Sequence, residues 1–156
     1  MPTNNIGYFA YGSNLSRQQM LERTGSVPNS RTAHLPNYQL AFHKVRGTEE
    51  VYAVIAPASG AIVHGVVYLC SSHAMTELDL FEGVSEGYYR RDSVQVSTAN
   101  GELLTAFTYL GGEAFSMEQG RPSEAYLNLI LTGAREHHLP QDYVSAIASL
   151  ARSGEP

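Results

Sequence analysis

The stretch that decides the fold lies near the start of the chain and reads Ile6-Gly7-Tyr8-Phe9-Ala10-Tyr11-Gly12-Ser13-Asn14-Leu15. Its first part, Ile6 to Tyr11, is a short apolar and aromatic run that predicts a buried strand. Gly12-Ser13-Asn14 breaks this run, and Ser16 is placed to cap a helix that continues to about Arg23. The first N–H groups of a helix have no partner within it, so the break offers a site for an anion or an oxyanion. A plain capped turn explains the same residues equally well.

Most of the remaining chain reads as strands that are joined in pairs. Runs rich in β-branched and aromatic residues predict strands at residues 31–43, 51–56, 62–69, 88–96 and 103–110. A break at Pro36-Asn37 interrupts the first of these runs. Pro57-Ala58-Ser59-Gly60 and Asn100-Gly101 are turn signals. They predict that the second and third runs form one hairpin and that the last two runs form another.

Three more segments have helical periodicity. One follows Ser71 or Ser72 and ends at Gly83, and its apolar face consists of Met75, Leu78 and Phe81. The next opens at Pro122-Ser123, and its apolar face consists of Leu127, Ile130, Leu131 and Ala134. A last short helix is predicted at about residues 141–151, after the adjacent histidines 137 and 138.

The order of these elements predicts the fold class. Helices and strands do not alternate regularly, as they would in a parallel doubly wound sheet. We therefore expect an α+β fold with a mixed, mostly antiparallel sheet, curled or closed into a small β-barrel and flanked by helices. The chain of 156 residues fits one domain spanning residues 1–156. A domain of this size buries about two thirds of its unfolded surface, so it needs no disulfide or metal to fold.

Charge and composition restrict the partners and the compartment. The formal net charge is −5 and the ten lysines and arginines are scattered, which argues against nucleic acid as a partner. No apolar run reaches the roughly 18 to 20 residues that span a bilayer, and the first residues do not resemble a signal peptide. Cys70 is the single cysteine, so an internal disulfide is impossible and a reducing, cytoplasmic location is expected. We interpret Cys70 as a buried apolar residue.

Glu82 is the carboxylate with the most unusual predicted surroundings. It follows Leu78 and Phe81 at the end of a predicted helix, and aromatic residues come shortly after it. Desolvation and the negative end of the helix dipole would both raise its pKa, as a general base near neutral pH requires. The pattern alone, however, favours a solvated glutamate in the last helical turn. Its neighbours Glu77 and Asp79 are interpreted as facing solvent.

Other kinds of catalytic centre find little support in the residues. No pair of histidines has the one-face spacing of a metalloprotease motif, and His137 and His138 are interpreted as surface or helix-end residues. The chain lacks the common phosphate-binding glycine motifs. Ser13 is not set in the nucleophile elbow of an α/β-hydrolase. No metal is therefore expected.

Three separated segments together resemble the γ-glutamylcyclotransferase family. The first is Tyr8 to Leu15, which resembles the opening signature of that family. The second is Leu78-Asp79 with Glu82-Gly83-Val84, Gly87 and Tyr89, which is similar to the segment around the family's catalytic glutamate. The third combines Pro122-Ser123 and Tyr126 with Gly133-Ala134, Leu139-Pro140 and Tyr143. The resemblance covers nearly the whole chain.

The resemblance implies a role for each matching residue. Glu82 would be the catalytic acid/base, and the substrate-binding residues would be Tyr8, Phe9, Ala10, Tyr11, Gly12, Ser13, Asn14, Tyr89 and Tyr126. The implied reaction cleaves a γ-glutamyl amide by attack of its own α-amine, releasing 5-oxoproline and a free amino acid or amine. It needs no cofactor or metal. The implied partner is a small γ-glutamyl substrate, and the implied role belongs to glutathione metabolism in the cytoplasm. For the oligomeric state, a homodimer is one option.

The first motif also bears on the substrate. With Asn14, the motif resembles that of the branch that acts on γ-glutamyl amino acids. The glutathione-specific branch usually has Tyr-Gly-Ser-Leu at this place, and the γ-glutamylamine branch has a motif like Tyr-Gly-Thr-Leu. The loops at residues 43–50 and 111–121 are expected to select the leaving amine. Alternatives are removal of a γ-glutamyl protecting group from a metabolite, or a binding module without catalysis. A further alternative is an interaction domain, which would need a sizeable exposed apolar patch.

Overall fold

Six strands form one sheet in the computed structural model, which describes residues 5–154. In chain order they are β1 (Ile6–Ala10), β2 (Ser30–Val45), β3 (Val51–Cys70), β4 (Tyr89–Thr98), β5 (Leu103–Gly111) and β6 (Phe115–Gln119). The order across the sheet is β3-β1-β5-β4-β2-β6, and β2 also pairs with β3, so the first five strands close into a barrel. β1 and β5 are parallel, and the other pairs within residues 5–154 are antiparallel. The predicted fold class is confirmed.

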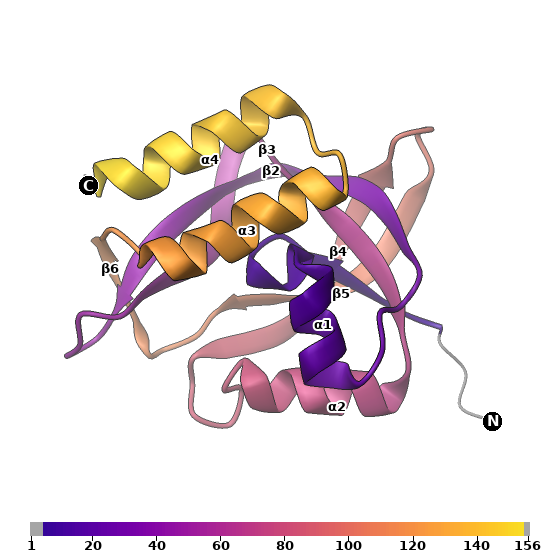
Figure 1. The fold of residues 1–156 in the computed structure, drawn as a ribbon, viewed down its shortest axis with the longest axis horizontal. Coiled ribbons are helices and arrows are strands. Elements are labelled where there is room, and N and C mark those ends of the chain that lie inside the picture. Colours follow the sequence, from indigo (N-terminus) through magenta and orange to yellow (C-terminus); the bar gives the residue numbers. More distant parts are fainter. Residues whose placement is uncertain (1–4, 155–156) are drawn as a thin grey trace.

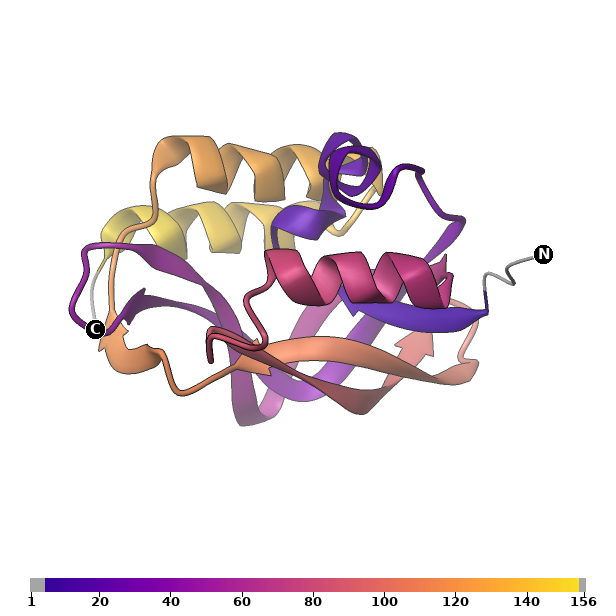
Figure 2. The same ribbon diagram turned by 90° about the horizontal axis from the view of Figure 1, so that it is seen from below.

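Helices cover one side of this barrel (Figures 1 and 2). They are the 3-10 turn η1 (Ser13–Leu15) and the helices α1 (Arg17–Thr24), α2 (Ser72–Phe81), α3 (Glu124–Glu136) and α4 (Gln141–Ser153). Ser16, Ser71 and Ser123 cap α1, α2 and α3 by accepting backbone N–H bonds through their hydroxyl oxygens. The predicted helix starts are thus confirmed. None of the helices within residues 5–154 combines the length and apolar character needed to cross a membrane.

The first strand is buried, as predicted, and lies between β3 and β5 in the barrel. β1 pairs with β3 on one side and with β5 on the other, and Phe9 and Ala10 are fully buried. The chain leaves β1 through η1 and enters α1, which ends at Gly25 in the left-handed conformation with φ of 86°. Cys70, at the end of β3, is also fully buried, and burial raises the pKa of its thiol to about 11. This agrees with its interpretation as an apolar residue.

The predicted hairpin between residues 51–56 and 62–69 is wrong. Both runs belong to one long strand, β3, which pairs with β2 along its length. The first pair joins Lys44 to Val51, and the last pair joins Ser30 to Tyr68. Residues 58–61 form a bulge opposite Asn37, between the pairs Pro36–Ile62 and Tyr38–Pro57. Asn37 has a φ of 63°, and its side-chain oxygen accepts a hydrogen bond from Gly60 N–H at 3.0 Å. The same turn-forming residues can make a bulge or a reversal. The actual reversal lies between β2 and β3. The other predicted hairpin, β4–β5, is confirmed.

Three local predictions also need correction. Phe81 does not complete the buried face of α2, because its side chain is 54% exposed while Met75 and Leu78 are buried. His137 ends α3 but is buried, and its Nε2 lies 2.9 Å from the carbonyl oxygen of Leu15. β6 was not predicted. Its residues beyond Phe115 are largely exposed and polar, so the hydrophobic pattern of a strand is missing.

The C-terminal helices hold the turn after β1 in place. Gly133 of α3 packs against the backbone of η1, where a Cβ atom would lie only 2.3 Å from the carbonyl carbon of Leu15. The Tyr68 hydroxyl donates a hydrogen bond to the carbonyl of Asn14 at 2.8 Å. Glycine is needed at residue 133 because any side chain would push α3 away from the turn.

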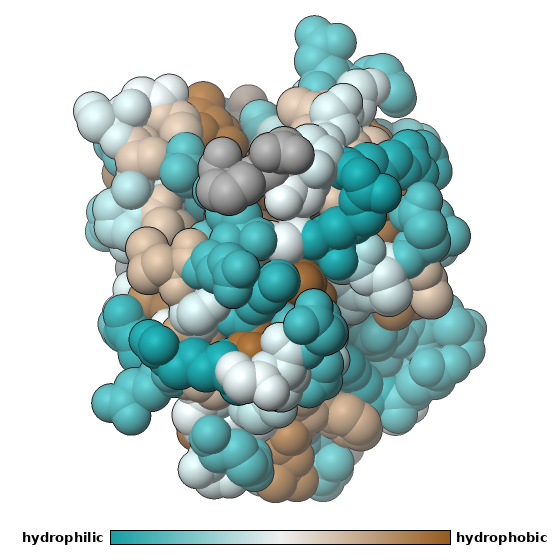
Figure 3. Space-filling view, turned by 90° about the vertical axis from the view of Figure 1, so that its left-hand side faces the viewer, coloured by the Kyte–Doolittle hydropathy of each residue, from teal (hydrophilic) through white to brown (hydrophobic). Residues whose placement is uncertain are grey.

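One face of the molecule bears on the interaction-domain alternative. Figure 3 shows a face that is mainly hydrophilic, where hydrophobic residues form small, separate areas. Among the residues drawn in colour on this face, no broad apolar surface is visible of the kind that marks protein interaction sites.

Candidate active site

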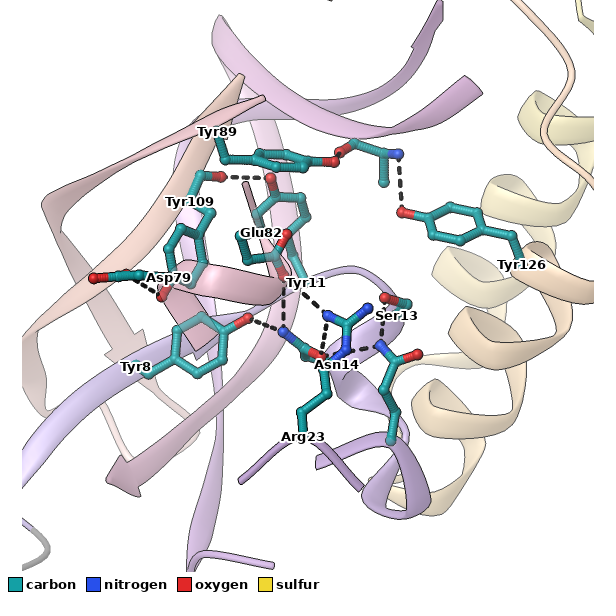
Figure 4. A network of polar contacts seen from close by, with 12 residues as sticks. Tyr8, Tyr11, Ser13, Asn14, Arg23, Asp79, Glu82, Tyr89, Tyr109 and Tyr126 are labelled. Atoms are coloured by element: carbon teal, nitrogen blue, oxygen red, sulfur yellow. Dashed lines mark hydrogen bonds and ion pairs between the residues drawn. The ribbon is translucent and has the colours of Figure 1, made fainter. Parts of the chain in front are cut away.

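Two adjoining cavities open where η1, α1, the end of α2, the start of β4 and α3 meet. The outer cavity has a volume of about 550 Å³ and the inner recess about 30 Å³. Both are lined by Ser13, Glu82, Tyr89 and Tyr126. Figure 4 shows these side chains converging from separate elements of the fold.

The structure brings most of the predicted site residues together. The inner recess is lined by Tyr8, Tyr11, Gly12, Ser13, Asn14, Glu82, Tyr89 and Tyr126, along with Ala53 and Tyr109. Phe9 and Ala10 do not line either cavity and are fully buried in the core. Phe9 instead contributes its carbonyl, which accepts a bond from the Thr108 hydroxyl. Sequence motif and cavity therefore agree except at these two positions.

Glu82 lies at the junction of the two cavities. It caps the C-terminus of α2, and its side chain is only 14% exposed. Its Oε1 accepts a hydrogen bond from Asn14 Nδ2 at 3.0 Å and lies 3.4 Å from Arg23 Nη1. Burial raises the pKa of the carboxyl to about 7, although Arg23 and Asn14 partly oppose the shift and Asp79 adds to it. The alternative of a solvated glutamate does not fit these surroundings.

Asn14 organises the charged groups around Glu82. Its buried side chain donates from Nδ2 to the Tyr8 hydroxyl at 2.8 Å as well as to Glu82. Its Oδ1 accepts from Gln19 Nε2 at 3.0 Å and from Arg23 Nη1 at 3.2 Å. Every hydrogen-bonding atom of the carboxamide is thus used, which fixes its orientation. An oriented amide of this kind holds the carboxylate in one place.

Sequence reasoning missed Gln19 and Arg23. Both belong to α1 and line the outer cavity, and Gln19 also donates to the Ser13 hydroxyl at 2.6 Å. A signal was present, because residues four apart share one helical face and α1 begins directly after the Tyr-Gly-Ser-Asn turn. In the structure this face of α1 borders the cavity beside the turn.

The tyrosines around the recess differ in the hydrogen bonds they can still make. Tyr11, Tyr89 and Tyr109 donate their hydroxyl hydrogens to the Tyr109 carbonyl, the Ala53 carbonyl and Asp79, respectively. Tyr8 and Tyr126 only accept, from Asn14 Nδ2 and from Ala53 N–H. Their own hydrogens have no acceptor within residues 5–154. Burial raises the pKa of both phenols, so they stay protonated and can donate into the recess.

Asp79 was predicted to face solvent, and this prediction is wrong. It accepts a hydrogen bond from the Tyr109 hydroxyl at 2.7 Å, and its Oδ2 lies 3.4 Å from Arg91 Nη2. Its negative charge contributes to the raised pKa of Glu82. Asp79 therefore belongs to the electrostatic surroundings of the site.

The outer cavity is bordered by other segments than the two predicted loops. Its lining includes Phe81, Gly83, Glu86 and Tyr88 from the segment between α2 and β4, and Leu129 from α3. Residues 43–50 and 111–121 are absent from the lining of both cavities in the described part of the chain. In residues 5–154, no three His, Cys, Asp or Glu side chains gather as metal ligands would.

Comparisons with known proteins point to one family. Residues 62–147 match the AIG2-like family. The chain is 33% identical to the γ-glutamylcyclotransferase of Mus musculus and 34% identical to that of Bos taurus. Each comparison covers 92% of this chain and 77% of the relative. A solved structure of a γ-glutamyl cyclotransferase superposes with a TM-score of 0.82 at 30% identity, covering 92% of this chain and 86% of that one.

The unusual burial of Glu82 predicts a pH-dependent stability. The pKa of Glu82 rises from 4.5 to about 7 on folding, so the folded protein binds this proton more tightly than the unfolded chain does. Its stabilising contribution is complete below pH 4.5 and is lost as the pH rises through 7. Between pH 5 and 8 the wild type should therefore lose about 2 to 3 kcal/mol of unfolding free energy relative to Glu82→Gln.

Urea unfolding of both proteins at several pH values measures this difference. Glu86→Gln provides the matched control, because Glu86 borders the same cavity but is exposed. Its pH dependence should follow that of the wild type. Parallel curves for wild type and Glu82→Gln would show that Glu82 is not a desolvated carboxylate.

Proposed function

Because the chain belongs to the γ-glutamylcyclotransferase, or AIG2-like, family, we propose that it cleaves a γ-glutamyl amide and releases 5-oxoproline with a free amino acid or amine. The observation that carries this proposal is the carboxylate of Glu82, which lines both the recess and the outer cavity and whose side chain is largely shielded from solvent. Its pKa of about 7 lets it accept and return a proton near neutral pH. The reducing cytoplasm is the proposed compartment, which suits the one free, buried cysteine.

The proposed reaction is an intramolecular acyl transfer. Glu82, as a carboxylate, takes a proton from the α-ammonium group of the substrate. The freed amine attacks the substrate's own γ-carbonyl carbon and closes a five-membered lactam. The bond from that carbon to the leaving nitrogen then breaks, and Glu82 returns its proton to this nitrogen. Atoms and charges balance without an added nucleophile, metal or redox partner.

The recess and the outer cavity together support this chemistry mainly by holding the substrate in position. A well-oriented intramolecular attack contributes about 7 to 11 kcal/mol. The hydrogen bonds that close the η1 turn run from Leu15 N–H to the Gly12 carbonyl and from Ser16 N–H to the Ser13 carbonyl. The N–H groups of residues 12–14 come before these donors and take no part in the bonds of the turn. These groups and the free hydroxyl hydrogens of Tyr8 and Tyr126 are donors for the developing oxyanion. One well-placed donor is worth roughly 3 to 4 kcal/mol.

Replacing the proposed base tests the function directly. Glu82→Gln keeps the size of the side chain but cannot accept the proton, so turnover should fall by at least about 10² to 10⁴-fold while substrate still binds. In the wild type, kcat/KM should fall about tenfold per pH unit below pH 7, because only the carboxylate is active. Formation of 5-oxoproline from a γ-glutamyl dipeptide is measured by mass spectrometry, and binding by calorimetry. Glu86→Gln is the control, and wild-type turnover by Glu82→Gln would rule out the assignment.

Filling the recess tests the role of the turn. A Cβ atom at Gly12 would lie 3.6 Å from Ala53 Cβ and 3.8 Å from the Tyr126 hydroxyl, both ordinary contacts. Gly12→Ala should therefore fold normally. In Gly12→Val, the extra methyl groups would occupy a recess of about 30 Å³. If the steric conflict between these methyl groups and the substrate costs as much as overpacking of a protein core, about 1 to 3 kcal/mol, affinity should fall roughly 5- to 150-fold. Unchanged affinity in a folded Gly12→Val variant would exclude this turn from the binding site.

A further inference from the structure

The outer cavity is much larger than the recess. The recess, at about 30 Å³, has room for little more than one water-sized group, whereas the outer cavity measures about 550 Å³. Cavities of the larger size hold ligands well beyond a single amino acid. A glutamyl group is no larger than one amino acid, so much of the outer cavity is left for the group that is joined to the γ-carbonyl. The lining of this remaining space therefore bears on the leaving group.

An apolar wall belongs to the outer cavity alone and consists of Tyr52, Phe81, Tyr88, Ala125 and Leu129. These residues come from β3, from the end of α2, from the segment before β4, and from α3. Ala125 and Leu129 are four residues apart, so they share one face of α3. Phe81 is 54% exposed, and Leu129 is not among the buried residues of α3. The wall thus presents apolar surface to the cavity that the core of the protein does not use.

Phe115 of β6 supports this wall from behind. It is buried, and its ring meets the rings of Tyr52 and Tyr88 edge to face, with ring centres 6.5 Å apart in both pairs. The Tyr52 ring also meets the Tyr126 ring edge to face, at 5.2 Å. Such packing favours particular ring orientations. The wall is therefore a preformed surface, and a ligand can bind it with little further ordering of side chains.

The glutamyl part of the substrate does not suit an apolar wall. It carries an ammonium group, a carboxylate and the reacting carbonyl, and these groups need polar partners when they leave water. The polar residues are grouped together, because the Asn14 amide is hydrogen-bonded to both Arg23 and Glu82. Figure 4 shows Asn14 and Arg23 on one side of Glu82 and Tyr89 on the other. Phe81 lies at the boundary of this group, since the Arg23 guanidinium is 5.0 Å from its ring centre.

We propose that the apolar wall selects substrates with a bulky apolar leaving group, so that γ-glutamyl compounds of aromatic or large aliphatic amines and amino acids are preferred to those of small ones. This inference rests on the proposed function and adds the class of the leaving group to it. Contact between apolar surfaces stabilises a complex roughly in proportion to the area removed from water. The preference should therefore increase with the apolar area of the leaving group.

Two matched pairs of substrates provide the test. γ-Glutamylphenylalanine and γ-glutamylalanine differ only by a phenyl group, and so do γ-glutamylphenethylamide and γ-glutamylethylamide. The value of kcat/KM for each compound is measured from 5-oxoproline formation, for the wild type and for Leu129→Ala and Phe81→Ala, which reduce the wall. Leu80→Ala is the control, because Leu80 is next to Phe81 and 66% exposed but outside the lining of both cavities. Circular dichroism of each variant establishes that it is folded.

In each pair that the wild type converts, the phenyl compound should be favoured about 10-fold, as expected for an aromatic ring that is partly buried on binding. Leu129→Ala and Phe81→Ala should each reduce this ratio about threefold, because part of the apolar contact is lost. Leu80→Ala should keep the full ratio. Phe81 also contacts Arg23, but an effect through that contact falls on both members of a pair and cancels in the ratio.

Equal values of kcat/KM for the two members of a converted pair in the wild type would overturn the inference. An unchanged ratio in both wall variants would overturn it as well, because the preference would then arise elsewhere. Failure of the wild type to release 5-oxoproline from any of these compounds would instead refute the proposed function.

Discussion

The hydrogen bond between the Asn14 amide and the Glu82 carboxylate is the contact on which the site depends. The two residues are 68 positions apart, and each is fixed by its own part of the fold. Asn14 sits in a turn that Tyr68 binds from behind and that α3 approaches closely through Gly133. Glu82 ends α2, whose inner face packs in the core through Met75 and Leu78. The barrel and its helices together hold one carboxylate against one amide.

Burying this carboxylate is unfavourable for stability and useful for chemistry. Desolvation raises the pKa of Glu82, and the nearby charge of Asp79 raises it further. Arg23 and the Asn14 amide lower the pKa of Glu82, so that part of the carboxyl groups remain ionised near neutral pH. The result is a carboxyl balanced between its two protonation states. The tyrosines surround it with protonated hydroxyl groups. Those of Tyr8 and Tyr126 only accept hydrogen bonds within residues 5–154, so their hydrogens can be donated to a ligand.

Local signals predicted much of this fold, and non-local contacts account for the rest. Ser16, Ser71 and Ser123 cap helices, as their spacing from apolar residues indicated. The bulge at residues 58–61 was mistaken for a hairpin turn, because proline and glycine mark a break in a strand without showing whether the chain reverses there. The pattern around Glu82 favoured a solvated side chain. Its partners Asn14 and Arg23 lie 68 and 59 residues away in the sequence, and no local pattern reveals such partners. Phe9 was predicted to bind substrate but lies in the core, because a sequence motif contains residues that support the fold as well as residues that bind.

The chemistry of the site depends on Glu82 titrating near neutral pH within the folded protein. Carbon-13 NMR of protein labelled at the glutamate side-chain carboxyl measures this titration directly, and the signal missing from Glu82→Gln assigns it. We expect one carboxyl resonance to titrate with a midpoint near pH 7, as the burial of Glu82 requires. A midpoint near the ordinary value of 4.5 would contradict the account, because the carboxyl would then be no more than a solvated helix-end glutamate.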